Sequence, residues 1–108
     1  MNFADYQSQA GATAIYPDQF QIMYPALGLS AEAGEVANKV KKIYRDHGGA
    51  LSEEARLAIA AEVGDVLWYC ANLCTDLGMN LSEVAQSNLD KLNSRLMRGV
   101  LGGSGDNR

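Results

Sequence analysis

Hydrophobic residues recur at helical spacing in three long segments, and no segment alternates in the way that a half-buried strand does. The segments begin after Tyr24-Pro25, at Ser52 and at Asn80, and they are expected to run to about Asp46, Leu77 and Arg98. A shorter helix is expected from about Phe3 to Thr13, ahead of the break at Tyr16-Pro17. The stripes expected to face inward are Leu29, Ala33, Val36, Val40 and Ile43; Ile59, Val63, Val66, Cys70, Leu73 and Leu77; and Leu81, Ala85, Leu89, Leu92 and Leu96.

The ends of these segments carry helix signals. Pro25 suits a first helical turn, and His47-Gly48-Gly49 ends the first long helix. Ser52 is an expected N-cap, and Asn80 with Glu83 forms an expected capping box. Because the connections at residues 47–52 and 78–80 are short, neighbouring helices are expected to be antiparallel. The pattern predicts an all-α fold, an antiparallel helical bundle of three or four helices.

Length and composition place these helices in one small domain. The chain has 108 residues, of which 47% are hydrophobic, and this composition indicates a folded core rather than disorder. A core of this size is marginal, so we expect oligomerisation to complete it. We expect a domain over residues 1–98 and a flexible, glycine-rich tail over residues 99–108.

Net charge and hydropathy limit the classes of partner that the chain is expected to bind. The net charge of −4 argues against a nucleic-acid polymer as partner, because such binding needs a basic face. It leaves open a polyanionic ligand that is carried in with a divalent cation. No apolar run reaches the length of a membrane span and no signal peptide opens the chain, so we expect a cytoplasmic protein without a membrane partner.

One short string occurs twice. Residues 31–36 read Ala-Glu-Ala-Gly-Glu-Val, and residues 61–66 read Ala-Glu-Val-Gly-Asp-Val. Each copy places two carboxylates three residues apart on one side of a helix. The acids flank the same side of each apolar stripe, so antiparallel packing brings all four toward one cleft. Four clustered carboxylates repel unless a cation lies between them. We therefore expect a metal site formed by Glu32, Glu35, Glu62 and Asp65.

The ligand types indicate which metal. Carboxylates without nitrogen or sulfur ligands suit Mg²⁺, Mn²⁺ or Ca²⁺. His47 is the only histidine, so zinc and di-iron sites are disfavoured, and Cys70 and Cys74 are expected to be small buried residues. A solvated acidic face, with Glu35 paired to Lys39 one turn on, remains the alternative.

Further polar residues lie where a substrate could be bound. Tyr69 follows Asp65 by one turn and can stack on a base or donate to a phosphate. Asn88, Lys91 and Arg95 form a row beside the apolar stripe of the last helix, where they can bind phosphate oxygens. The alternative for Tyr69 is a half-buried core residue without a binding role, and the alternative for the row on the last helix is a solvated helix edge. Gly34 and Gly64 suggest either close helix packing or room for a ligand.

The ordered motifs resemble a known family. Gly-Leu-Ser-Ala-Glu-Ala-Gly-Glu-Val at residues 28–36, followed by Glu-Val-Gly-Asp-Val-Leu-Trp-Tyr at residues 62–69, is similar to the MazG-like nucleotide pyrophosphohydrolases of the all-α NTP pyrophosphatase superfamily. The likeness spans about residues 24–98, and it includes the closing helix at residues 88–95. The family hallmark is Glu-Glu-x-x-Glu, a spacer and Glu-x-x-Asp. Ala31 stands where many members have the first glutamate.

The resemblance implies an activity. It implies Mg²⁺-dependent hydrolysis of nucleoside triphosphates to a nucleoside monophosphate and pyrophosphate, with Mn²⁺ as a possible substitute. The metal ligands and catalytic residues would be the four carboxylates, with Glu32 or Glu35 as general base. Tyr69, Asn88, Lys91 and Arg95 would bind the substrate, and the chain would form a homodimer or homotetramer. A non-catalytic helical module that binds a metal or nucleotide, or that serves oligomerisation, is the alternative.

Overall fold

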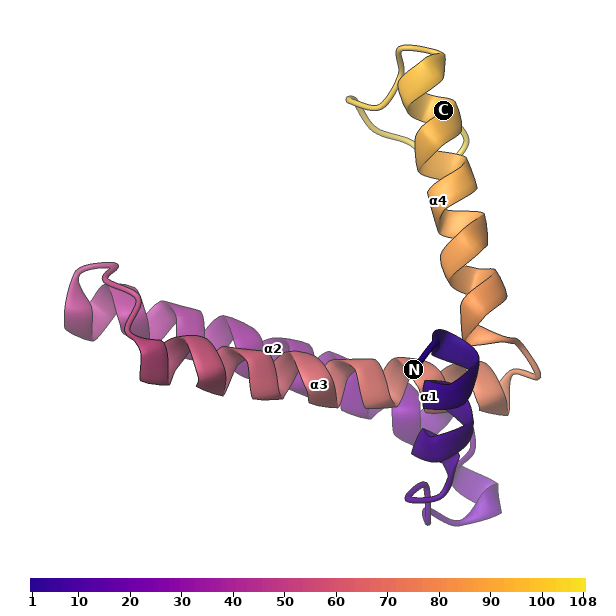
Figure 1. Cartoon of the computed structure of the whole chain (residues 1–108), viewed down its shortest axis with the longest axis horizontal. Helices are drawn as coiled ribbons and strands as arrows, with labels where there is room; N and C mark the ends of the chain where they lie inside the picture. The colour runs from indigo at the N-terminus through magenta and orange to yellow at the C-terminus, as the bar shows by residue number, and fades with distance from the viewer.

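The computed structural model describes residues 1–108 and is entirely helical (Figure 1). The helices are α1 (Phe3–Gly11), the short 3₁₀ helix η1 (Asp18–Phe20), α2 (Met23–His47), α3 (Glu53–Asp76) and α4 (Leu81–Met97). The all-α prediction is confirmed, and the four expected helices lie within about two residues of their expected bounds. The 3₁₀ helix was not expected.

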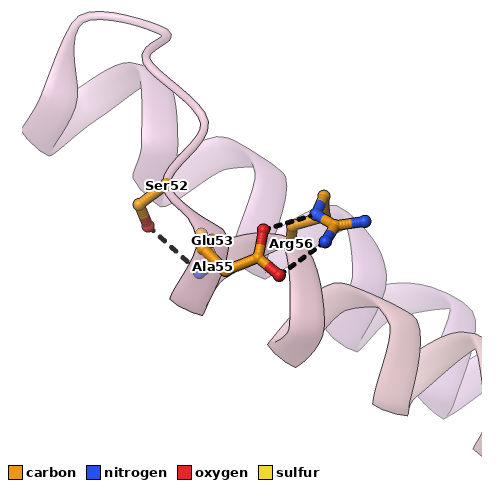
Figure 2. Close-up of polar contacts among 4 residues, drawn as sticks. All are labelled: Ser52, Glu53, Ala55 and Arg56. Atoms are coloured by element: carbon orange, nitrogen blue, oxygen red, sulfur yellow. Dashed lines mark hydrogen bonds and ion pairs between the residues drawn. The ribbon is translucent and has the colours of Figure 1, made fainter.

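Helices α2 and α3 form a long antiparallel hairpin, as their short connection predicts (Figure 1). Helix α2 ends at Gly48, whose φ of 59° is readily adopted by glycine. Ser52 begins α3 as predicted, because its Oγ accepts a 3.1 Å hydrogen bond from the amide of Ala55. Figure 2 shows this cap beside the paired side chains of Glu53 and Arg56. The hairpin therefore has a defined turn at its closed end.

Helix α1 packs across the other end of the hairpin. The buried core there consists of Ala10, Ala71 and Leu81, with Trp68 among the half-buried residues packed against it. The Trp68 indole Nε1 donates to Thr13 Oγ1 at 2.8 Å. Two elements distant in sequence, α1 and α3, are thereby joined through apolar contact and a hydrogen bond.

The segment between α1 and α2 contains a strained turn. Ile22 has a φ of 68° and a ψ of −55°, and the amide of Met23 donates to the carbonyl of Gln21 at 2.7 Å, which is the geometry of a γ-turn. Asp76 Oδ2 accepts from the Ile22 amide at 2.9 Å and from the Tyr16 hydroxyl at 2.8 Å. Burial, followed by this hydrogen bond, raises the pKa of Tyr16. One carboxylate at the end of α3 thus fixes the entry to α2.

Helix α4 points away from the α2–α3 hairpin (Figure 1). The expectation that the connection at residues 78–80 makes α4 antiparallel to α3 was wrong for a single chain. The expected capping box also differs, because the Asn80 side chain makes no cap hydrogen bond. Gln7 of α1 replaces it: its Oε1 accepts from the Leu81 amide at 2.9 Å, and its Nε2 donates to the Met79 carbonyl. This contact between α1 and the start of α4 fixes the direction in which α4 leaves.

Much of the predicted inward stripe is exposed. Only seven of the 108 residues are buried. Ile43 and Leu81 are buried as expected, whereas Val63 is 53% exposed. The other stripe residues that are exposed are Ala33, Val40, Leu77, Leu89, Leu92 and Leu96. The expectation was wrong for these residues in a single chain, because α4 has no helix against its stripe beyond Leu81 and the seam between α2 and α3 is narrower than their apolar faces.

The tail after α4 is folded back in the structure. The Arg108 guanidinium donates to four backbone carbonyls, those of Val100, Leu101, Gly102 and Gly105. Arg95 and Arg98 of α4 donate to the carbonyl oxygens of Asp106 and Arg108, each at 2.7 Å. Arginine side chains therefore organise the tail, which its glycine content alone does not predict.

Helix α3 is, by length and composition, apolar enough to cross a membrane, contrary to the expectation from the sequence. Its 24 residues include a window of mean hydropathy 1.3, of which 17% is buried in the single chain. The same test is passed by core helices of soluble proteins. Helix α3 carries Glu62 and Asp65 near its middle, where charges are costly in lipid. This placement favours a protein surface as the partner of its apolar faces.

Candidate metal and substrate site

Three of the four predicted carboxylates meet between α2 and α3. Glu32 from α2 and Glu62 and Asp65 from α3 each offer an oxygen atom, and these atoms lie within 4.8 Å of one another. We call these three residues the acidic triad. Glu62 and Glu32 are half-buried, whereas Asp65 is exposed. Glu35 lies outside the triad and is exposed. The antiparallel hairpin thus converts two sequence repeats into one cluster.

The neighbouring carboxylates perturb Glu32. The pKa of Glu32 is raised, first by a hydrogen bond with the Glu62 side chain, then by desolvation and by the negative charges of Glu62, Asp65 and Glu35. A raised carboxyl pKa means that the site favours a proton, or another cation, between these oxygens. This is the electrostatic behaviour expected of a cation site.

Lys39 supplies one positive charge at the triad. Its Nζ lies 3.3 Å from Glu62 Oε1, and the two side chains are 35% and 18% exposed. The alternative pairing of Lys39 with Glu35 along α2 does not occur; the lysine reaches across to α3 instead. Sequence reasoning missed this contact, although the spacing of seven residues between Glu32 and Lys39 places both on one side of α2.

The residues of the triad fit a divalent metal. Opposite ligands of one Mg²⁺ lie about 4.2 Å apart, since each lies at about 2.1 Å from the ion. The 4.8 Å spread of the triad therefore requires only a small closure of the side chains. The ligands are all carboxylate oxygens, which Mg²⁺ and Mn²⁺ prefer. Glu35 is one turn from Glu32 and is the nearest candidate from the repeat for a further ligand.

Tyr69 lies beside the triad, where the sequence placed it. Its pKa is raised mainly by burial, with smaller contributions from Tyr24, Glu32 and Asp65. The Tyr69 ring lies 5.0 Å from the Trp68 ring in an edge-on arrangement and 6.3 Å from the Tyr24 ring. An aromatic wall therefore adjoins the carboxylates on the side toward α1.

The row on α4 does not reach the triad within one chain. Asn88 and Lys91 are exposed, and Arg95 is buried with its Nη2 donating to the Asp106 carbonyl. Helix α4 points away from the hairpin that carries the acids (Figure 1). These three residues remain predicted substrate ligands, and a second copy of the chain would have to bring them to the acids.

The glycines of the two repeats have no packing role in the single chain. A Cβ at Gly34 or Gly64 would meet no atom within 4 Å. Close helix packing inside one chain is therefore not the reason for either glycine. Room for a ligand, or close packing against a second subunit, is the other explanation.

Comparisons with known proteins identify the family of the chain. The MazG nucleotide pyrophosphohydrolase domain matches residues 24–98, which span α2, α3 and α4. The Gene 37 protein of Mycobacterium phage L5 is 52% identical over 109 residues, covering 95% of this chain and 96% of the phage protein. No solved structure matches the chain.

Proposed function

The chain belongs to the MazG nucleotide pyrophosphohydrolase family, and on that premise we propose that it hydrolyses nucleoside triphosphates, with Mg²⁺, to a nucleoside monophosphate and pyrophosphate. The observation that carries the proposal is the acidic triad of Glu32, Glu62 and Asp65, which gathers carboxylate oxygens from two helices within 4.8 Å. A cluster of this kind is costly without a cation, and a nucleoside triphosphate brings Mg²⁺ with it.

The residues of the site divide the chemistry among them. Glu62, Asp65 and Glu32 would hold Mg²⁺, with Glu35 as a fourth ligand; when bound, the ion offsets the charge of the phosphate oxygens. A water molecule attacks the α-phosphorus, and the bond to the oxygen that bridges the α- and β-phosphorus atoms breaks. Pyrophosphate leaves with that electron pair. The proton of the water passes to a carboxylate, and Glu32 or Glu35 would accept it.

The remaining predicted residues bind the nucleotide. Tyr69 stands beside the triad and would contact the sugar or base. Lys91 and Arg95 would neutralise phosphate oxygens, and Asn88 would orient them. Since α4 points away from its own triad, this assignment requires the α4 row of one chain to serve the triad of another.

We propose, accordingly, that the chain works as a homodimer or homotetramer. Leu89, Leu92 and Leu96 are 52%, 38% and 62% exposed along α4, and only seven residues of the chain are buried. Burying apolar area of this kind stabilises by roughly 25 cal/mol per Å². Light scattering coupled to size-exclusion chromatography should give twice or four times the 11.6 kDa mass of one chain. A monomer at micromolar concentration would contradict the assembly.

The activity is tested with a panel of ribo- and deoxyribonucleoside triphosphates and Mg²⁺, by measuring pyrophosphate and orthophosphate separately. We expect pyrophosphate, and we expect Glu62→Gln and Asp65→Asn to abolish its release. Glu83→Gln, on the exposed first turn of α4, is the matched control and should retain activity. Release of orthophosphate alone would mean that a different bond is cut. Mg²⁺-dependent nucleotide binding without turnover would favour the non-catalytic module.

A further inference from the structure

A cavity of about 320 Å³ lies at the closed end of the α2–α3 hairpin, next to the acidic triad. Its α2 wall carries Lys39, Lys42 and His47, and its α3 wall carries Ser52 and Glu54. Lys39 to His47 spans about 12 Å along α2, at about 1.5 Å per residue. The cavity is at the small end of the range for ligand pockets, about 300 to 1,000 Å³. Its size suits part of a nucleotide rather than a whole one.

The lining of this cavity favours an anion. Two lysines and a histidine face one carboxylate, that of Glu54, so the walls carry net positive charge in a chain whose net charge is −4. The Ser52 hydroxyl accepts from the Ala55 amide at 3.1 Å (Figure 2), which leaves its proton free to donate. Lysine and serine are residues that commonly bind phosphate oxygens.

Lys39 connects the cavity to the triad. It lines the cavity, and its Nζ is also 3.3 Å from Glu62 Oε1. In the structure the ammonium group of Lys39 offsets the negative charge of the Glu62 carboxylate. Once a divalent cation takes over that role, the Lys39 side chain is released from Glu62 and can turn toward the cavity. The cavity therefore begins where the triad ends, along one side of the hairpin.

We propose that this cavity binds the β- and γ-phosphates of the substrate, and hence the pyrophosphate product, with Lys39 and Lys42 as its charged ligands. This inference rests on the proposed function, because the pyrophosphate is the product of the proposed hydrolysis. It assigns the leaving group to residues of α2 and the start of α3, distinct from the α4 row. The α-phosphate then lies at the triad and the terminal phosphates lie toward the hairpin turn.

The test is titration calorimetry of the whole chain with pyrophosphate in the presence of Mg²⁺. Lys42→Met should weaken pyrophosphate binding about tenfold, the equivalent of about 1.4 kcal/mol. Glu54→Gln should tighten it severalfold, because a repulsive charge leaves the wall. Lys41→Met is the matched control: Lys41 neighbours Lys42 on α2, is exposed and does not line the cavity, so its effect should stay below about twofold. Thermal unfolding of each variant verifies that it is folded.

Equal effects of Lys42→Met and Lys41→Met would show general charge attraction and would overturn the inference. The same holds if Glu54→Gln weakens binding. Nucleoside triphosphate turnover is measured separately. If the chain hydrolyses nucleoside triphosphates but the variants do not change pyrophosphate binding as expected, the proposed function stands and this cavity is refuted as the product site. If the variants change pyrophosphate binding as expected but no nucleoside triphosphate is hydrolysed, the anion site is supported and the proposed function is refuted.

Discussion

The phenol ring of Tyr69 occupies the space beside Gly28 where a side chain would otherwise lie. A Cβ at Gly28 would fall well inside the contact distance of three ring carbons of Tyr69. Gly28 stands one turn before Glu32 on α2, and Tyr69 stands one turn after Asp65 on α3. The ring therefore lies between the two helices on one side of the acidic triad, and a glycine is required for it to do so.

Gly28→Ala should destabilise the chain by about 1 to 3 kcal/mol, because either the Tyr69 ring or the helix must move. Gly34→Ala is the matched control on the same helix. A Cβ there meets nothing within 4 Å, so alanine should stabilise the helix by about 1 kcal/mol. Urea unfolding measures both changes. Equal stabilisation by the two substitutions would contradict the placement of Tyr69.

The triad and Glu35 should differ in their effect on metal binding. Mn²⁺ or Mg²⁺ should raise the unfolding temperature, and Glu62→Gln, which removes a half-buried carboxylate of the triad, should abolish that rise. Glu35→Gln removes an exposed carboxylate outside the triad and should reduce that rise without abolishing it. Metal titrations followed by thermal unfolding measure the difference. The reverse order would place Glu35, rather than Glu62, at the centre of the site.

Stability without metal should depend on pH through Glu32. Its pKa is raised, so its contribution to stability is complete below the ordinary value of 4.5 and is lost as pH rises through the raised value. The unfolding temperature in chelator should therefore fall as the pH rises above 4.5 and through the raised pKa of Glu32. The pKa of Asp46 is lowered by its hydrogen bond from Arg45. Its titration therefore changes stability only below the ordinary carboxyl pKa of 3.8 and does not contribute to this fall.

Two comparisons isolate the Glu32 effect. Glu32→Gln should flatten the pH dependence, because the substituted side chain does not titrate. Saturating Mg²⁺ should reverse it, since metal ligands must lose their protons to bind. An unchanged slope in Glu32→Gln would assign the pH dependence to another group.

Asp76→Ala should destabilise the chain by about 2 kcal/mol, because two hydrogen-bond donors lose their acceptor. The donors are the amide of the strained Ile22 and the hydroxyl of Tyr16. Asp18→Ala, which removes a carboxylate that accepts no hydrogen bond, is the control and should change stability by less than about 0.5 kcal/mol. Chemical denaturation measures both. A similar small effect of Asp76→Ala would mean that the turn does not depend on this carboxylate.

The sequence predicts those features that depend on local chemistry. Ser52 as N-cap and Gly48 as the end of α2 follow from patterns within a few residues. The meeting of Glu32 with Glu62 and Asp65 follows from the short connection that makes α2 and α3 antiparallel, although Glu35 was expected there too and lies outside the triad. Features that depend on distant residues were missed. Gln7 takes the place of the expected Asn80 cap, and Lys39 reaches Glu62 across the hairpin. Spacing along one helix does not encode such contacts.

The direction of α4 is the largest difference between expectation and structure. A short connection and an apolar stripe predict packing against α3, but they do not identify which surface covers the stripe. Leu96 is 62% exposed although its spacing is that of a core residue. The pattern predicts that this face is covered, and it does not distinguish coverage by the same chain from coverage by a second copy.

The fluorescence of Trp68 can report on the packing of α1 and on ligand binding beside Tyr69 without an added label. It is the only tryptophan of the chain, so the indole emission comes from one place. Its indole nitrogen donates to Thr13 at the end of α1, and its ring adjoins Tyr69 beside the acidic triad. Detachment of α1 would expose the indole to water and shift its emission to longer wavelength. A ligand that displaces Tyr69 would change the quenching of the same indole, so one optical signal would report both the packing of α1 and the binding of a ligand beside the triad.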